Sequence, residues 1–203
     1  MGGWDHDNRP SPAQQRRAEQ LALCNAKAFG IVASQLQKRE AAHPTLPMLC
    51  DLHQLATTDM IASAGHLRTT DVTITGSRHA PPPAHNVAAL LDSLFADLQS
   101  EPWSNASAFD TAAFALWRLN WIHPFDDGNG RTARAIAVIV LFTRLQRLPI
   151  AQLGKPTFLD HLAWRKLDYF DALEAADRAC AASTIDISAL SQLLYECLRD
   201  SLA

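Results

Sequence analysis

Apolar residues recur at every third or fourth position through most of this 203-residue chain, and that spacing predicts a helical fold. Helix-start signals agree with it. Residues 11–14 (Ser-Pro-Ala-Gln) form a capping box with proline at the first helical position. Ser107 and Thr157 are further candidate N-caps. The apolar stripes comprise Leu21, Cys24, Ala28, Ile31, Val32 and Leu36; Leu49, Leu52 and Leu55; Val87, Leu90, Leu91, Leu94, Phe95 and Leu98; Phe109, Leu116 and Leu119; and the segments 135–142, 167–181 and 187–202.

Residues 70–80 break this pattern. They are rich in β-branched side chains that alternate, they contain a turn signal at Gly76-Ser77, and three prolines at 81–83 follow them. We therefore expect an all-α fold with one short β-hairpin. An isolated hairpin is marginally stable, so this one should pack on the helices or offer a mobile edge to an extended peptide. An ordinary surface hairpin is the alternative interpretation.

Composition limits the class of protein. The chain is 48% hydrophobic and 19% charged with a net charge of −3 and a pI of about 6.2, so we expect no general nucleic-acid binding. Residues 1–10 are polar and do not resemble a signal peptide. The apolar run 135–142 is too short to span a membrane. The four scattered cysteines include no zinc-type pair. A cytoplasmic protein without membrane attachment is predicted, while delivery into a host cell stays open.

Residues 123–134 read His-Pro-Phe-Asp-Asp-Gly-Asn-Gly-Arg-Thr-Ala-Arg and concentrate the chemistry of the chain. Pro124 disfavours helical geometry in the residue before it, so a helix should end at His123. A histidine with an ordinary pKa of about 6.5 can accept a proton from a hydroxyl at neutral pH. Asp127 is a candidate ligand for Mg²⁺, which needs few protein carboxylates. Taken singly, His123 could be a structural helix-end residue and Asp127 a loop hydrogen-bonding residue.

The second half of this segment is suited to anions. The glycines of Gly128-Asn129-Gly130 allow positive φ angles and an anion-binding nest of backbone N–H groups. The helix that should follow adds the positive end of its dipole. Arg131 and Arg134 are three residues apart and can share one face. Salt bridges to the protein's own carboxylates are the alternative. Together, the parts suit a metal-bound triphosphate placed beside a nucleophile.

The segment matches the signature of the Fic-domain family, H-P-F-x-[D/E]-G-N-G-R-x-x-R, at every fixed position. Residues 64–68, 72–74 and Pro81-Pro82 also resemble the approach to that family's target-docking hairpin, the flap. Residues 169–173 with Asp177 resemble its later helix. The resemblance covers about residues 46–200, so we expect a Fic domain over 46–203 and an N-terminal helical region, 1–45, packed on it.

This resemblance implies transfer of AMP from ATP to a Ser, Thr or Tyr hydroxyl of a target protein, with release of pyrophosphate. His123 would then be the base and Asp127 would hold Mg²⁺. Asn129 and the glycine amides would hold the α- and β-phosphates, and the two arginines the outer ones, with Arg134 at the γ-phosphate. The target would dock on the hairpin 70–81. The implied nucleotide-binding residues are Thr75, Gly76, Gly128, Asn129, Gly130, Arg131, Arg134, Tyr169, Phe170 and Asp177.

Two features indicate the subclass. Family members that phosphorylate their targets carry lysine where this chain has Gly130, so the glycine favours nucleotide transfer. Many members also restrain themselves through an inhibitory [S/T]-x-x-x-E-[G/N] helix whose glutamate engages the second motif arginine. None of the glutamates of this chain fits that pattern, so we expect either an antitoxin-like inhibitor acting in trans or constitutive activity. The glutamates are Glu19, Glu40, Glu101, Glu174 and Glu196.

Other functions remain open from the sequence. The motif binds phosphates and says little about the base, so transfer of UMP, GMP or phosphocholine is an alternative. A catalytically silent peptide-binding module would need none of the motif's polar residues. A metal-dependent hydrolase built on His123 and Asp127 would need further ligands, such as His53 or His161. The target, and whether the chain is a toxin or a host-directed effector, stay open.

Overall fold

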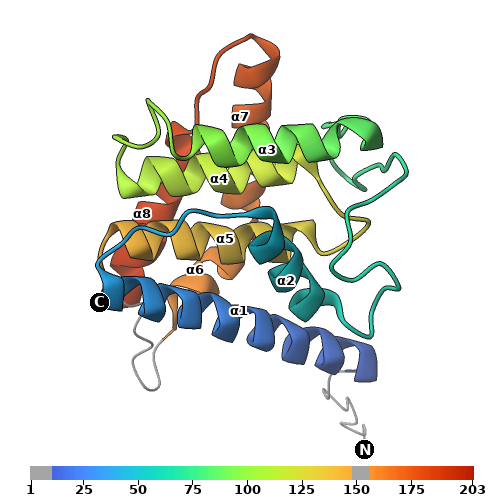
Figure 1. Cartoon of the computed structure of the whole chain (residues 1–203), viewed down its shortest axis with the longest axis horizontal. Coiled ribbons are helices and arrows are strands. Elements are labelled where there is room, and N and C mark those ends of the chain that lie inside the picture. The colour runs from blue at the N-terminus through green and yellow to red at the C-terminus, as the bar shows by residue number, and fades with distance from the viewer. Residues whose placement is uncertain (1–10, 148–155) are drawn as a thin grey trace, which may run out of the picture.

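The computed structural model of the chain describes residues 11–147 and 156–203. Within these residues it is all-helical, as the apolar spacing predicts, and Figure 1 shows the arrangement. A short 3₁₀ helix, Ala84–Asn86, leads into α3. The α-helices are α1 (Pro12–Lys38), α2 (Leu46–Thr57), α3 (Val87–Asp97), α4 (Ala108–Ile122), α5 (Asn129–Arg144), α6 (Phe158–Trp164), α7 (Lys166–Ala181) and α8 (Ser188–Leu202).

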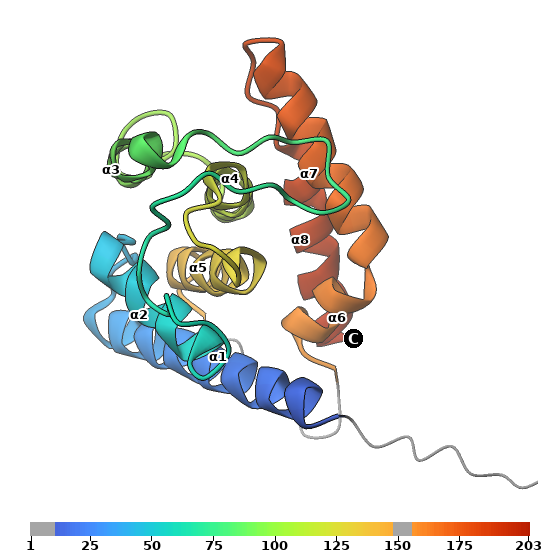
Figure 2. The same ribbon diagram turned by 90° about the vertical axis from the view of Figure 1, so that its right-hand side faces the viewer.

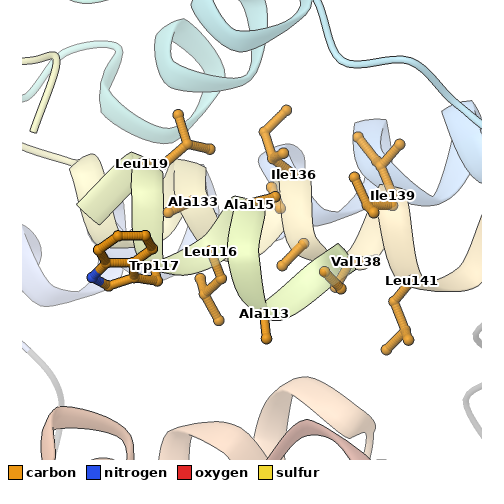
Figure 3. Packing of buried hydrophobic residues seen from close by; sticks show 14 of the residues in the cluster. Ala113, Ala115, Leu116, Trp117, Leu119, Ala133, Ile136, Val138, Ile139 and Leu141 are labelled. Atoms are coloured by element: carbon orange, nitrogen blue, oxygen red, sulfur yellow. The ribbon is translucent and has the colours of Figure 1, made fainter. Parts of the chain in front are cut away.

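The helices α4 and α5 form the centre of the molecule. Small residues such as Ala113, Ala115 and Ala133 are buried between larger apolar side chains there (Figure 3). α1 and α2 pack on α5, while α3 and α8 pack on α4 (Figure 2). The apolar run of α5 is therefore buried by protein. No helix in the described part of the chain is long and apolar enough to cross a bilayer.

The helix boundaries follow from local chemistry. The Ser11 hydroxyl accepts from the backbone N–H of Gln14, whose side chain accepts from the Ser11 N–H, which confirms the predicted capping box. As predicted, Ser107 and Thr157 are the N-caps of α4 and α6: their side chains accept from the N–H groups of Asp110 and Asp160. The helix before the motif ends at Ile122, with His123 as its C-cap, and the next begins at Asn129. Residues 123–128, the motif loop, are therefore bounded at both ends by residues of the motif itself.

The predicted β-hairpin is not formed. Residues 69–83 contain no strand, although a turn does occur, with Ser77 N donating to Ile74 O at 3.1 Å and φ of +79° at Gly76. Figure 2 shows this segment passing over α4 to α7 and returning to α3. The prediction was wrong because β-propensity depends on a partner surface, and prolines 81–83 can donate no ladder hydrogen bond.

The N-terminal helix α1 packs along both α2 and α5. Cys24, Ala28 and Val32 form its buried stripe. Residues 1–10 of the predicted N-terminal region lie outside the described part of the chain. The division between residues 45 and 46 stays a prediction.

Candidate active site

His123 lies at the end of α4 in the left-handed region, with φ 51° and ψ 60°. Its Nδ1 donates to the carbonyl of Asn120 at 3.2 Å, because a carbonyl can only accept. In the neutral ring this leaves the lone pair on Nε2. Burial lowers the pKa of His123, and the bond to Asn120 only partly opposes the effect. The residue is thus held as a neutral imidazole with one nitrogen able to accept a proton.

A pocket lies beside His123, between the turn at 75–76, α4 and α7. Its empty volume is about 700 Å³, including the space open to solvent. Asp177 on its wall accepts a hydrogen bond from Trp117 Nε1 at 2.8 Å. Of the residues predicted from the sequence, the pocket brings together Thr75, Gly76, His123, Phe170 and Asp177. The remaining lining residues are Ile74, Ser77, His79, Trp117, Asn120, Trp121, Leu173 and Glu174.

Tyr169 lies behind this pocket and does not line it. Its ring is buried, and its hydroxyl accepts from Asn120 Nδ2 at 3.1 Å. Burial raises the pKa of the Tyr169 hydroxyl, and the nearby Arg134 opposes that effect. Tyr169 therefore connects the pocket wall to the Arg134 side of the site.

The start of α5 is built by Gly128 and Asn129. Gly128 is the N-cap with φ +80°, and a Cβ on it would lie only 2.5 Å from Thr57 Cγ2. The side chain of Asn129 accepts from Phe125 N at 2.9 Å and donates to Phe125 O at 2.8 Å, so it is used to shape the loop. Because a helix leaves its first N–H groups without intrahelical partners, the backbone amides of Asn129 and Gly130 are available to donate hydrogen bonds to an anion placed at this point.

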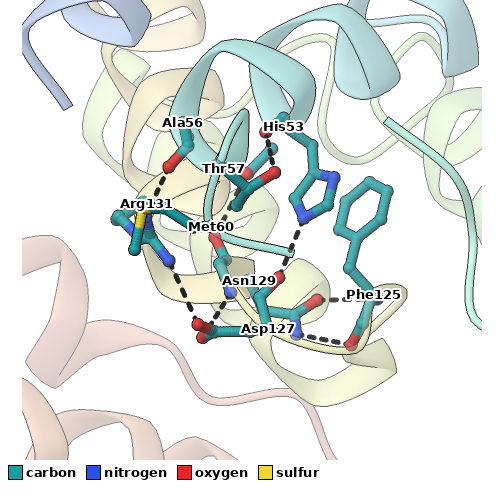
Figure 4. Close-up of polar contacts among 10 residues, drawn as sticks. His53, Ala56, Thr57, Met60, Phe125, Asp127, Asn129 and Arg131 are labelled. Carbon is teal, nitrogen blue, oxygen red and sulfur yellow. Dashed lines mark hydrogen bonds and ion pairs between the residues drawn. The ribbon is translucent and has the colours of Figure 1, made fainter. Parts of the chain in front are cut away.

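The two motif arginines have different surroundings. Arg131 is buried; it donates to the carbonyl of Ala56 in the last turn of α2 and pairs with Asp127 Oδ2 at 3.3 Å (Figure 4). Arg134 is half-buried, and no carboxylate within the described residues forms an ion pair with it. The buried thiol of Cys24 on α1 is close enough to feel both arginines: burial raises its pKa to about 11, and the two arginines oppose this.

The two aspartates of the motif have separate roles. Asp126 accepts a hydrogen bond from the hydroxyl of Ser63 at 2.6 Å. Asp127 accepts from Gly128 N at 2.6 Å and pairs with Arg131, yet its side chain is 55% exposed. Across residues 11–147 and 156–203 no three His, Cys, Asp or Glu residues form a metal-binding group. A cation here would thus have Asp127 as its protein ligand, and its other ligands would come from water or substrate.

Residues 43–141, including the motif loop and its flanking helices, match the Fic/DOC family. This chain belongs to that family. The protein adenylyltransferase Fic of Drosophila grimshawi is 38% identical over 108 residues, which are 52% of this chain and 21% of that protein. The enzyme of that name from Nematostella vectensis is 28% identical over 143 residues, 65% of this chain and 31% of that protein. The chain therefore spans only about a fifth to a third of these relatives.

Solved Fic structures share the fold. Fic-1 from C. elegans aligns with a TM-score of 0.68 at 19% identity, over 95% of this chain and 51% of that one. A Fic-domain signalling protein from Bacteroides thetaiotaomicron aligns with a TM-score of 0.72 at 20% identity, over 98% of this chain and 74% of that one. The helical architecture of the Fic fold accordingly extends well beyond the signature.

Sequence reasoning did not predict that His53 supports the motif loop. Its ring is fully buried and stacks on Phe125, with centroids 3.6 Å apart. Gly65 N donates to Nδ1 at 2.9 Å, so Nε2 carries the proton and donates to Asp127 O at 2.8 Å. Both nitrogens are therefore used by backbone, and His53 supplies no metal ligand for a hydrolase. No spacing in the sequence links residue 53 to residues 125–127.

Arg68 and Asn120 were also missed as site residues. Arg68 is buried and donates to the carbonyl of His123 at 2.8 Å. Asn120 lines the pocket and contacts both His123 and Tyr169. The pattern around residue 64–68 gave a signal for the approach to the flap but none for a contact with the base.

Proposed function

We propose that the chain is a protein adenylyltransferase, which transfers AMP from ATP to a Ser, Thr or Tyr hydroxyl of a target protein. The observation that carries this proposal is the neutral His123 on the wall of a pocket, together with the pocket residue Asn120, which lies next to the start of α5. A Cβ on Gly130 would lie 3.9 Å from Asn120 Oδ1, a side chain of that same pocket. The candidate general base, His123, is thereby close to the start of α5, where the phosphates would bind.

The chemistry follows from these positions. The target oxygen would attack the α-phosphorus of ATP and form a new P–O bond, while the bond to the bridging oxygen of the β-phosphate breaks. His123 Nε2 would take the hydroxyl proton, and pyrophosphate would leave. The lowered pKa keeps His123 able to accept this proton at neutral pH. Catalysis would come mainly from positioning and from stabilisation of phosphate charge.

The triphosphate would be held at the start of α5. The backbone amides of Asn129 and Gly130, the helix dipole and Arg134 all present positive charge there. Arg131, which is already bonded to α2 and Asp127, would support the loop and act on the phosphates through its charge. Asp127 would hold Mg²⁺, which would neutralise phosphate charge. The half-exposed carboxylate and its lone pairs fit that role.

The adenine end of ATP would lie between the turn at residues 75–76 and α7. Thr75, Gly76, Phe170 and Asp177 would surround it. The target would dock on the segment 70–81. Its backbone has no strand partner in the described part of the chain, so an extended peptide can pair with it. In this mode of binding the contacts are mainly hydrogen bonds to the backbone of the target peptide. The residues of this segment therefore do not identify the target, which has to be found by experiment.

Control of the site would act at Arg134. A carboxylate from a further segment or from an antitoxin-like protein could pair with this guanidinium and displace the γ-phosphate. Cys24 on α1, whose thiol is influenced by the charges of both motif arginines, is neutral because burial raises its pKa to about 11. No carboxylate of the described residues forms an ion pair with Arg134.

Labelled nucleotides test the proposal. A lysate incubated with the chain and Mg²⁺ should gain label from ATP labelled at the α-phosphate but not from ATP labelled at the γ-phosphate, and His123→Ala should abolish transfer. UTP, GTP and CDP-choline in parallel would identify another transferred group. Transfer of γ-label would indicate a kinase, and an absence of transfer with every donor would leave the silent binding module as the better description.

A further inference from the structure

The flap segment, residues 69–83, is held without a strand ladder. Its only internal backbone bond is that of the turn, from Ser77 N to Ile74 O. Side chains make the remaining connections. Asp71 Oδ1 accepts from Ala84 N at 2.7 Å, and His79 Nε2 donates to the carbonyl of Trp121 in α4 at 2.7 Å. The shape of this segment thus depends on a few polar side chains.

One of them, Arg68, contacts the end of α4 and both arms of the flap, that is, the stretches of residues 69–83 before and after the turn. Its side chain is fully buried. Nη1 donates to Thr70 O at 3.0 Å on the first arm, and Nη2 donates to Pro82 O on the second. Nε donates to His123 O at 2.8 Å, and Nη2 lies 3.4 Å from Ile122 O. The backbone N–H of Arg68 also donates to Pro124 O at 2.9 Å.

Only arginine can make this set of contacts. A guanidinium offers five N–H donors in a planar fork, whereas a lysine ammonium offers three at one point. The carbonyls of Ile122 and His123 belong to the negative end of α4, which attracts a cation. Asp71 lies 3.9 Å away with a side chain that is 77% exposed, so solvent weakens that pair. Carbonyl dipoles therefore provide most of the compensation for the buried charge.

We propose that Arg68 is a positioning residue that couples the flap to the base. One buried guanidinium sets both arms of residues 69–83 and the His123 carbonyl in a single arrangement. The left-handed backbone of His123 precedes proline and is strained for a non-glycine residue, and the Arg68 bond fixes the peptide plane that follows it. The segment that would present the target hydroxyl and the ring that would receive its proton move together. This proposal rests on the proposed function for its catalytic consequence only.

The test compares Arg68→Lys with Arg144→Lys. Arg144 is a matched control because its half-buried guanidinium also donates to backbone carbonyls, those of Ser104 and Ala106 at 3.0 and 2.8 Å. It lies at the far end of α5, about 20 Å from the start of that helix. Thermal unfolding of both variants establishes that each folds. Residue-resolved amide hydrogen exchange and α-label transfer from ATP are then measured on the full chain.

For Arg68→Lys we expect three protected amides to exchange at least about tenfold faster together: Ser77 in the flap, Ala84, which is bonded to the flap residue Asp71, and His123. Turnover at saturating ATP should fall at least about tenfold. The dissociation constant for ATP should rise by a smaller factor, because Arg68 does not contact the start of α5 and affects the nucleobase end only through the flap residues Thr75 and Gly76. Arg144→Lys should alter none of these. Faster exchange in only one of the two regions, or unchanged turnover in an active wild type, would overturn the coupling. If the wild type transfers no label, the proposed function fails, and the exchange data alone decide whether Arg68 couples the flap to His123.

Discussion

Gly128→Ala is expected to strain the start of α5 in two separable ways. Alanine would have to adopt φ of +80°, and its Cβ would lie 2.5 Å from Thr57 Cγ2 and 3.2 Å from two ring atoms of His53. A left-handed non-glycine residue costs about 1–2 kcal/mol, and overpacking of a close contact costs about 1–3 kcal/mol. The free energy of unfolding should therefore fall by about 2–5 kcal/mol, and label transfer should fall with it as the amides at the helix start shift.

Thr57→Ser separates the two contributions. Serine removes only the Cγ2 methyl and keeps the hydroxyl that donates to His53 O at 2.7 Å. Alone, it should cost about 1 kcal/mol or less through a small cavity. In the Gly128→Ala background it should instead restore most of the overpacking share, about 1–3 kcal/mol. Urea unfolding of the four proteins gives the coupling energy. Simple additivity of the two substitutions would refute the packing that we derive for Gly128.

Three further outcomes are expected. Asp127→Asn should raise the Mg²⁺ concentration for half-maximal label transfer at least about tenfold. It should barely change the melting temperature, since the carboxylate that pairs with Arg131 is 55% exposed and such a pair contributes no more than about 1 kcal/mol. An unchanged Mg²⁺ requirement would argue against this ligand. Because burial lowers the pKa of His123 below the ordinary 6.5, the initial rate should fall to half its maximum at a pH below 6.5. A midpoint at or above 6.5 would contradict it. Cys24→Glu should place a carboxylate within charge range of both Arg131 and Arg134 and reduce label transfer at least about tenfold, whereas the neutral, equally long Cys24→Gln should not. Equal loss in both would show a packing effect instead.

The parts of the fold that the sequence predicted are those determined by neighbouring residues. Capping at Ser11, Ser107 and Thr157 needs only groups three residues away. The helix end at His123 follows from Pro124, the next residue. Each of these features could be predicted because no distant segment is involved in it.

The flap shows the opposite case. Its β-branched residues satisfied every local criterion for a hairpin, yet the structure uses Arg68, Asp71 and His79 to hold an open segment against α4 and the 3₁₀ helix. Apart from Thr70, which is two residues from Arg68, the partners of these side chains lie 13 to 55 residues away. Strand propensity reports suitability for a sheet surface, and this fold provides no neighbouring strand in its described part to form one.

The two motif arginines show that contacts with distant residues also determine the roles of side chains within the site. At i and i+3 they are equivalent in sequence, and both were expected on phosphates. In the structure, Arg131 satisfies the Ala56 carbonyl at the end of α2, much as Arg68 satisfies carbonyls at the end of α4. Helix C-termini leave such carbonyls unpaired and negative, so each buried guanidinium meets a need created by another helix. Arg134 has no such carbonyl or carboxylate partner among the described residues, and for that reason we propose it as the phosphate ligand. The assignment of one arginine to support and the other to the phosphates thus depends on the packing of α2, which residues 123–134 alone do not contain.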